Sequence, residues 1–162
     1  MIVISKYRLE EIQTGIFCVR SYEVNVCPIC GDTVFVIGTR KRTCINAAGA
    51  RQILIIRRLR CKACHVIHHE LPDMLIPYKR HCADTVEKII SEDIVSVCCE
   101  FRTIQRIKTW WANCRMYFES VMTSLCEKYS IAFSLDPAPK EIVRAVANAH
   151  LWPHTRSACL SG

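Results

Sequence analysis

Two Cys-x-x-Cys pairs constrain the fold of this chain more than any other feature of its sequence. Cys27 and Cys30 form the first pair, Cys61 and Cys64 form the second, and 30 residues separate the two pairs. Two residues between cysteines let both sulfurs of a tight turn face one ion, and two such turns supply the four tetrahedral ligands that zinc prefers. Gly31 follows the first pair and supplies the positive φ that such a turn often needs. The pattern predicts a closed structural site with Zn2+ as the cofactor.

The other eight of the twelve cysteines lie outside these pairs. The amino-terminal residues lack the basic start, long apolar centre and cleavage site of a secretory signal. We therefore expect thiols in a reducing compartment, and hence a cytoplasmic protein, rather than a disulfide scaffold. No apolar run approaches the roughly 20 residues of a membrane span, so we expect no membrane association.

The segment between the cysteine pairs predicts a β-hairpin. Residues 33–37 and 51–60 are rich in aliphatic side chains and read as strands. The intervening residues 38–49 would form a long basic loop that carries Arg40, Lys41 and Arg42. Two strands clamped at one end by a metal ion form a zinc ribbon, which we expect to occupy residues 1–70. Such a small module buries little apolar surface, so the metal should supply much of its folding free energy.

The second half of the chain predicts helices. Residues 71–81 form a connector bracketed by prolines, after which apolar residues recur at helical spacing. Short apolar segments at residues 83–91 and 94–98 precede a third at residues 102–111, which combines an apolar face with a basic, polar face. This order predicts a helix-turn-helix across residues 82–115. Residues 116–162 would add C-terminal helices and a tail, and the fold class would be α+β.

The net charge of the chain is concentrated in its middle. Residues 40–108 contain 14 Lys or Arg against 7 Asp or Glu, so this segment accounts for the whole net charge of +7. A basic middle indicates a polyanionic partner, and nucleic acid is the commonest one. The polar face of the third apolar segment carries residue types that contact phosphates and base edges. The candidate DNA-contacting residues are Arg40, Lys41, Arg42, Arg57, Arg58, Arg60, Lys79, Arg80, Arg102, Thr103, Gln105, Arg106, Lys108 and Thr109.

Three stretches resemble a bacterial family of small zinc-ribbon and helix-turn-helix proteins of unassigned function. They are the cysteine pairs, the run from Arg57 to Cys64 and the run from His69 to Arg80. Members of this family look like the DNA-binding front ends of insertion-sequence transposases. Residues 103–110 also resemble the recognition helix of transposase and resolvase helix-turn-helix units. The resemblance covers roughly residues 20–115 and implies binding of double-stranded DNA in connection with mobile elements or transcription.

One departure from that resemblance bears on catalysis. A transposase of this kind continues into a ribonuclease-H-like domain with three metal-binding carboxylates, but only 47 residues follow Arg115. This is too short for such a domain. The sequence therefore predicts a zinc-dependent DNA-binding protein that is not an enzyme.

Three alternatives remain open from the sequence. One is an adaptor that binds a transposase or another protein partner, and a second is RNA as the ligand, since ribbons bind either polymer. A third is a metal-dependent nuclease built on the crowded group His68, His69, Glu70 and Asp73, although nothing pairs these residues with a nucleophile or a defined acid and base.

Three histidines follow the second cysteine pair. Because four thiolates already complete a closed site, we expect His65, His68 and His69 to be surface or packing groups.

Overall fold

The computed structural model describes residues 1–130 and 137–153, in which strands come first and helices follow. The strands are β1 (Ile2–Ile4), β2 (Tyr7–Gln13), β3 (Ile16–Ser21), β4 (Val34–Ile45), β5 (Arg51–Cys61) and β6 (Ile67–Pro72). The helices are α1 (Ala83–Ile90), α2 (Phe101–Tyr129) and α3 (Pro139–Asn148). Within the described ranges, no helix combines the length and the hydrophobicity needed to cross a bilayer.

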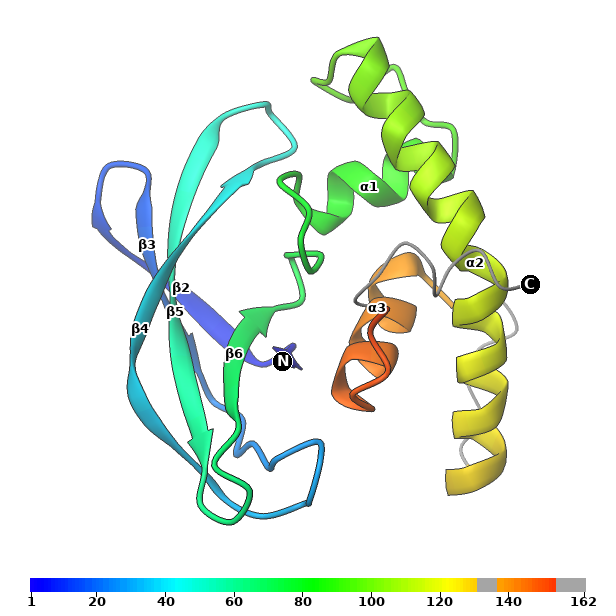
Figure 1. Ribbon diagram of the computed structural model, residues 1–162. Coiled ribbons are helices and arrows are strands. Elements are labelled where there is room, and N and C mark those ends of the chain that lie inside the picture. The colour runs from blue at the N-terminus through cyan, green and yellow to red at the C-terminus, as the bar shows by residue number, and fades with distance from the viewer. Residues whose placement is uncertain (131–136, 154–162) are drawn as a thin grey trace.

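The six strands form one curled, mixed sheet with the order β1-β6-β5-β3-β2, and β4 lies along the other side of β5 (Figure 1). β5 pairs with β4 and β6 in antiparallel fashion and with β3 in parallel fashion. β1 adds to β6 as a second parallel pair, and β2 and β3 form an antiparallel hairpin. The sheet therefore joins segments from both sides of the first cysteine pair.

The central and edge strands differ in burial, as their sequences require. In β5, the central strand, Leu54, Ile56 and Leu59 are buried and belong to the hydrophobic core. β4 pairs only with β5 among the described strands, and half of its residues are exposed. Charged side chains suit such an edge, because they discourage pairing with another chain.

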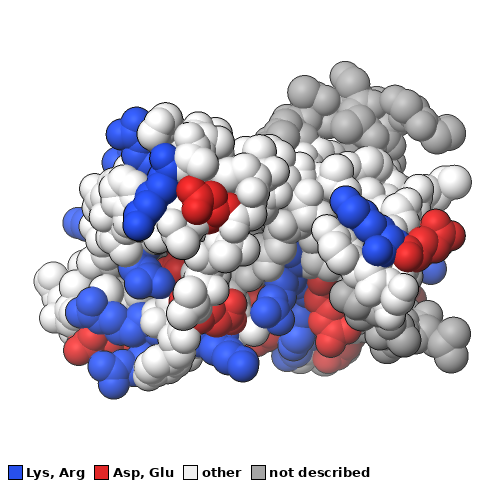
Figure 2. Space-filling view, turned by 90° about the horizontal axis from the view of Figure 1, so that it is seen from below, with Lys and Arg blue, Asp and Glu red and all other residues white. Residues whose placement is uncertain are grey.

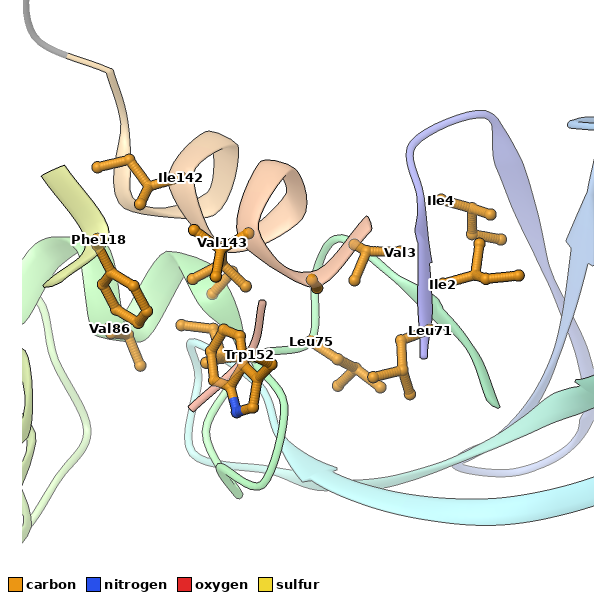
Figure 3. Packing of buried hydrophobic residues seen from close by; sticks show 14 of the residues in the cluster. Ile2, Val3, Ile4, Leu71, Leu75, Val86, Phe118, Ile142, Val143 and Trp152 are labelled. Carbon is orange, nitrogen blue, oxygen red and sulfur yellow. The ribbon is translucent and has the colours of Figure 1, made fainter. Parts of the chain in front are cut away.

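One hydrophobic core joins the sheet to the helices. Helix α3 lies between β1 and the long helix α2 (Figure 1). Its Ile142 and Val143 lie between Phe118 of α2 and Val3 of β1 (Figure 3). The side chain of Asn148 fixes this arrangement, because its amide accepts a 2.7 Å hydrogen bond from the backbone N–H of Val3 and donates a 2.9 Å bond to the Val3 carbonyl.

The predicted fold class is wrong. The hairpin of β4 and β5 does carry the cysteines at one end, but it is part of a six-stranded sheet rather than a separate zinc ribbon. The predicted long loop at residues 38–49 is also wrong, because β4 continues to Ile45 past an irregularity in its pairing between Val36 and Gly38. Arg40, Lys41 and Arg42 therefore lie on a strand.

The helix-turn-helix is likewise absent from the described structure. Residues 94–98 form turns instead of a helix, with Ile94 and Val95 exposed. The helix that begins at Phe101 does not end after a recognition-helix length but runs unbroken for 29 residues. Its apolar face is as predicted, since Ile104 and Ile107 are buried. The expected domain boundaries at residues 70, 81 and 115 stay predictions, although α2 passes through residue 115.

Candidate metal centre and basic groove

The four paired cysteines meet at the lower end of the sheet in Figure 1, where β4 begins and β5 ends. Their Sγ atoms all lie within 4.8 Å of one another. Cys27 Sγ lies 3.6 Å from Cys64 Sγ, and Cys30 Sγ lies 3.4 Å from Cys61 Sγ. A disulfide needs about 2 Å, whereas four sulfurs around one ion at about 2.3 Å lie about 3.8 Å apart. The residues therefore fit one tetrahedral metal ion.

Both cysteine turns have the same backbone form. In the first turn the Gly31 N–H donates to the Cys27 carbonyl at 2.8 Å, and Gly31 has a φ of 77°. In the second turn the equivalent position is His65, which has a φ of 59°. The left-handed conformation suits glycine and is costly for histidine.

This asymmetry gives a first prediction. Gly31→Ala should lower the free energy of unfolding by about 1 kcal/mol, because nothing lies within 4 Å of the added Cβ and only backbone strain changes. The converse change, His65→Gly, should leave that free energy unchanged or raise it. Urea unfolding midpoints of both variants, measured with metal present, test the pair. A midpoint that falls in His65→Gly and stays constant in Gly31→Ala contradicts the assignment.

A buried histidine lies directly behind the cluster. His68 is 1 % exposed, and its Nε2 lies 3.3 Å from Cys27 Sγ. With its proton on Nε2, the imidazole donates to a thiolate at Cys27 and so orients a metal ligand. The expectation that His68 is a packing group missed this contact. Alternation in β6 was the available signal, because residues 68 and 70 share the face of the strand that is buried.

The cluster cannot hold four negative charges without a cation. Burial raises the pKa of Cys61, but hydrogen bonds from the Cys64 backbone and from Cys30 lower it more, to about 7. A hydrogen bond from the Val66 backbone lowers the pKa of Cys64, but burial and the neighbouring sulfurs raise it more, to about 12. One sulfur therefore ionises well before another, and a divalent cation would supply the charge that lets all four ionise.

An ion pair with one fully buried partner ties three segments together. The Glu70 carboxylate is fully buried on β6 and accepts hydrogen bonds from Arg57 Nε at 2.6 Å and Arg57 Nη2 at 2.5 Å. Asn25, two residues before the first cysteine, donates Nδ2 to the same carboxylate at 2.7 Å. Glu70 thus connects β5, β6 and the segment that leads into the metal centre.

A second feature, away from the cysteines, is a basic groove made by two cavities. One cavity of about 410 Å3 runs along β4 and is lined by Arg40, Lys41, Arg42, Thr43, Ile45, Arg51 and Arg80. The other, of about 630 Å3, lies between the connector and the start of α2, and its lining includes Tyr78, Lys79, Arg80, Thr103 and Arg106. Ile45 and Arg80 line both cavities, so the two cavities adjoin each other, and the larger one also includes the acidic Glu100. We call these two cavities together the basic groove.

Among the residues that the structure describes, no acidic side chain forms an ion pair with the cations of the smaller cavity. In the described part of the chain, the six ion pairs involve none of Arg40, Lys41, Arg42, Arg51 or Arg80. Arg42 donates Nη2 to the Lys79 carbonyl at 2.8 Å, whereas its buried Nε has no hydrogen-bond partner. Burial, and then the charge of Arg40, lowers the pKa of Arg42. By contrast, the face seen from below mixes basic and acidic side chains (Figure 2).

A model of the family described as a domain of unknown function (DUF6431) matches residues 27–107, half of the chain. The chain belongs to the DUF6431 family. The family segment begins at the first metal-centre cysteine and ends in α2, so it contains both cysteine pairs and every residue that lines the basic groove. No curated protein and no solved structure matches the chain. The resemblance to transposase front ends therefore stays a prediction.

The structure places the other predicted DNA-contacting residues at several locations. Arg57 is bonded to Glu70, and Lys108 Nζ lies 3.1 Å from Glu92 Oε1. Thr103 and Arg106 line the larger cavity. The remaining predicted residues, Arg58, Arg60, Arg102, Gln105 and Thr109, lie on β5 or α2 and do not line either cavity. Arg51 and Tyr78 do line the groove, and the sequence interpretation omitted both.

Proposed function

We propose that this DUF6431 protein binds double-stranded DNA without catalysing a reaction, and that a zinc ion at the cysteine cluster stabilises it. The observation that carries the proposal is the smaller cavity of the basic groove, with five cations and no acidic side chain in its lining. A polyanion is the ligand that such a surface favours, and nucleic acid is the most abundant polyanion in a cell.

The unpaired state of these cations strengthens the proposal. Lys or Arg side chains that lack acidic neighbours condense anions from solution, and a phosphate backbone replaces those anions with a gain in entropy. If Arg40, Lys41, Arg42, Arg51 and Arg80 each neutralise one phosphate, the logarithm of the affinity should fall against the logarithm of salt concentration with a slope of about −4.5. The proposed contact is to the DNA backbone, along β4 and the connector.

The metal centre supports the groove from a distance. Zinc is the ion that a set of four thiolates binds most often in a closed structural site, and it leaves no open position for a reacting water. By joining the start of β4 to the end of β5, the ion would hold the strand that carries Arg40, Lys41 and Arg42.

The position of Glu70 argues against the nuclease alternative. Its carboxylate is bonded to Arg57 and Asn25, and His68 is buried against Cys27. These two members of the His68, His69, Glu70 and Asp73 group are therefore committed to structural contacts. We expect duplex DNA to stay intact after incubation with the protein and a divalent metal, and specific cleavage would contradict this part of the proposal.

Charge removal in the groove tests the DNA proposal. The triple variant Arg40→Gln, Arg51→Gln and Arg80→Gln should lower duplex affinity at least about 100-fold at 0.1 M salt and reduce the salt slope by about 2.7, because three phosphate contacts are lost. Fluorescence anisotropy with a labelled duplex across a salt series measures both quantities.

The matched control removes the same charge elsewhere. Lys6, Arg8 and Lys62 are exposed and line neither cavity of the groove, so the triple Gln variant at these positions should bind nearly as wild type. Equal losses in the two triple variants would show that only net charge matters, and would contradict a groove-specific site. A wild-type slope near zero would contradict DNA binding altogether. A duplex RNA of the same length, measured alongside, decides between the two polymers.

A protein adaptor is the second candidate function, favoured by one observation. Apolar side chains around the cysteine turns are exposed, including Val26, Ile29, Phe35, Val36 and Ile67. Together with the exposed edge of β4, they would accept an extended segment of a partner protein as an added strand. Early elution from a heparin column, at low salt, would favour this candidate over DNA binding.

A further inference from the structure

The basic groove also contains an aromatic side chain. Neither the positive charge of the groove nor the metal site accounts for its presence. Tyr78 lines the larger cavity, and it also lines a small cavity of about 120 Å3 that includes Arg40 and Arg42. Its side chain is 68 % exposed, although the two residues before it, Ile76 and Pro77, are buried. The ring is therefore not needed for the core.

The backbone at Tyr78 has a conformation that tyrosine rarely adopts. The Lys79 N–H donates to the Ile76 carbonyl at 3.1 Å, Pro77 occupies the second position of this four-residue turn, and Tyr78 has a φ of 62°. This is the pattern of a type II turn, whose third position requires a positive φ and is normally glycine or asparagine. A tyrosine there is strained, and residues held against such strain gather at functional sites.

The turn is also held rigidly from two sides. On one side, Arg42 of β4 donates to the Lys79 carbonyl at 2.8 Å. On the other side, Lys79 Nζ lies 3.9 Å from the centre of the Trp110 ring of α2. Tyr78 thus projects from an anchored turn, and its exposed side chain lies beside the cations that line the groove.

An exposed aromatic ring between cations suits an unpaired nucleotide. Bases stack on aromatic faces whatever their sequence, while neighbouring Lys and Arg neutralise the backbone. The larger cavity, at about 630 Å3, lies within the usual size range of small-molecule sites, about 300–1,000 Å3. A base inside an intact duplex has no exposed face to offer this ring.

We propose that Tyr78 is a stacking platform that takes an unpaired base of DNA whose phosphates lie in the basic groove. This inference rests on the proposed function and adds a ligand class to it: DNA with a single-stranded end, gap or extruded base. The backbone contacts would then be shared with duplex DNA, and the stacking contact would be made only by unpaired bases.

A comparison of base-bearing and abasic DNA isolates the stacking contact. Wild-type protein should bind a ten-nucleotide single strand about 10-fold more tightly than an abasic strand of the same length, because both carry the same phosphates. Tyr78→Gly should abolish this preference while leaving affinity for the abasic strand and for a blunt duplex within about twofold. Tyr78→Phe should retain the preference, since the ring stacks without its hydroxyl.

Two controls separate a loss of stacking from a loss of folding and from a general effect of removing an exposed tyrosine. Glycine fits a positive φ, so Tyr78→Gly should fold with a melting temperature no lower than that of wild type. Tyr22 is similarly exposed and lines neither cavity of the groove, so Tyr22→Ala should bind as wild type. If Tyr78→Gly keeps the preference, or weakens abasic and base-bearing strands equally, the stacking platform is wrong while duplex binding still stands. If wild type binds neither strand nor duplex, the proposed function itself fails.

Discussion

Removing the metal should lower the melting temperature of this protein by more than about 10 °C, the largest effect we expect from any single treatment. Apolar packing does little to hold the cysteine turns together. Val26 and Ile29 of the first turn and Val66 of the second are exposed, so apolar burial there is small. Without the ion, crowded sulfurs whose ionisation is mutually unfavourable would also face one another.

The ion stabilises more than two turns, because the pairing of β4 with β5 begins next to it. Val34 lies opposite Cys61 in the register of these strands, and β5 is the central strand of the sheet. Fraying at this end would expose Leu59, which belongs to the core. The loss should therefore be felt as lower stability of the sheet rather than as local disorder alone.

Cysteine variants make the prediction specific to the cluster. Cys27→Ser and Cys61→Ser should each lose stoichiometric zinc, measured by elemental analysis, and should melt at least about 10 °C below wild type. Cys98→Ser is the matched control, because Cys98 is an exposed thiol outside the cluster, and its variant should keep both metal and melting temperature. Wild-type protein without bound metal, or with a melting temperature that a chelator does not change, would contradict a structural metal site.

The cysteine cluster was predicted correctly and the separate zinc ribbon was not. The difference is that one depends on local geometry and the other on long-range strand pairing. Each Cys-x-x-Cys turn is local, and its geometry follows from a few residues. The strands that surround the hairpin are not local, because β1 pairs with β6 and β3 pairs with β5 across long stretches of chain. No periodicity in residues 2–21 indicates which distant strand those residues will join.

The positions of the basic residues led to two wrong predictions, one in the sheet and one in the helical half. Arg40, Lys41 and Arg42 read as a loop because consecutive cations rarely suit a buried strand, yet an edge strand such as β4 tolerates them. In the helical half, the basic face after Phe101 read as a short recognition helix. The periodic burial of Ile104 and Ile107 was correct, but periodicity reports which face is buried and not where a helix ends.

The second large effect is expected at the ion pair of Glu70 and Arg57. Glu70→Ala should lower the free energy of unfolding by about 1–3 kcal/mol, because it leaves the half-buried Arg57 guanidinium without its carboxylate. Asn25 would lose its acceptor at the same time. Arg57→Ala should cost more, about 3–5 kcal/mol, because it leaves the fully buried Glu70 carboxylate without its guanidinium.

The double variant Glu70→Ala and Arg57→Ala distinguishes pairing from packing. Because it removes both charges together, its loss of stability should be clearly smaller than the sum of the two single losses. Urea unfolding of the four proteins gives the coupling energy directly. The exposed pair of Arg20 and Glu10 is the matched control in the same sheet, and its alanine variants should show no measurable coupling.

Loss of the hydrogen bonds of Glu70 should also lower the affinity of the metal centre for its ion. Asn25 precedes Cys27 by two residues, and Glu70 follows His68, which contacts the Cys27 sulfur, by two residues. Glu70→Ala should therefore weaken metal retention by up to about 10-fold against a competing chelator, because Asn25, close to the ligand Cys27, would lose its hydrogen-bond acceptor. A variant that is destabilised but keeps wild-type metal affinity would confine Glu70 to the sheet. Additive stability losses in the four-protein comparison would instead show that the two side chains act independently, and that the short contacts between them do not hold β5 to β6.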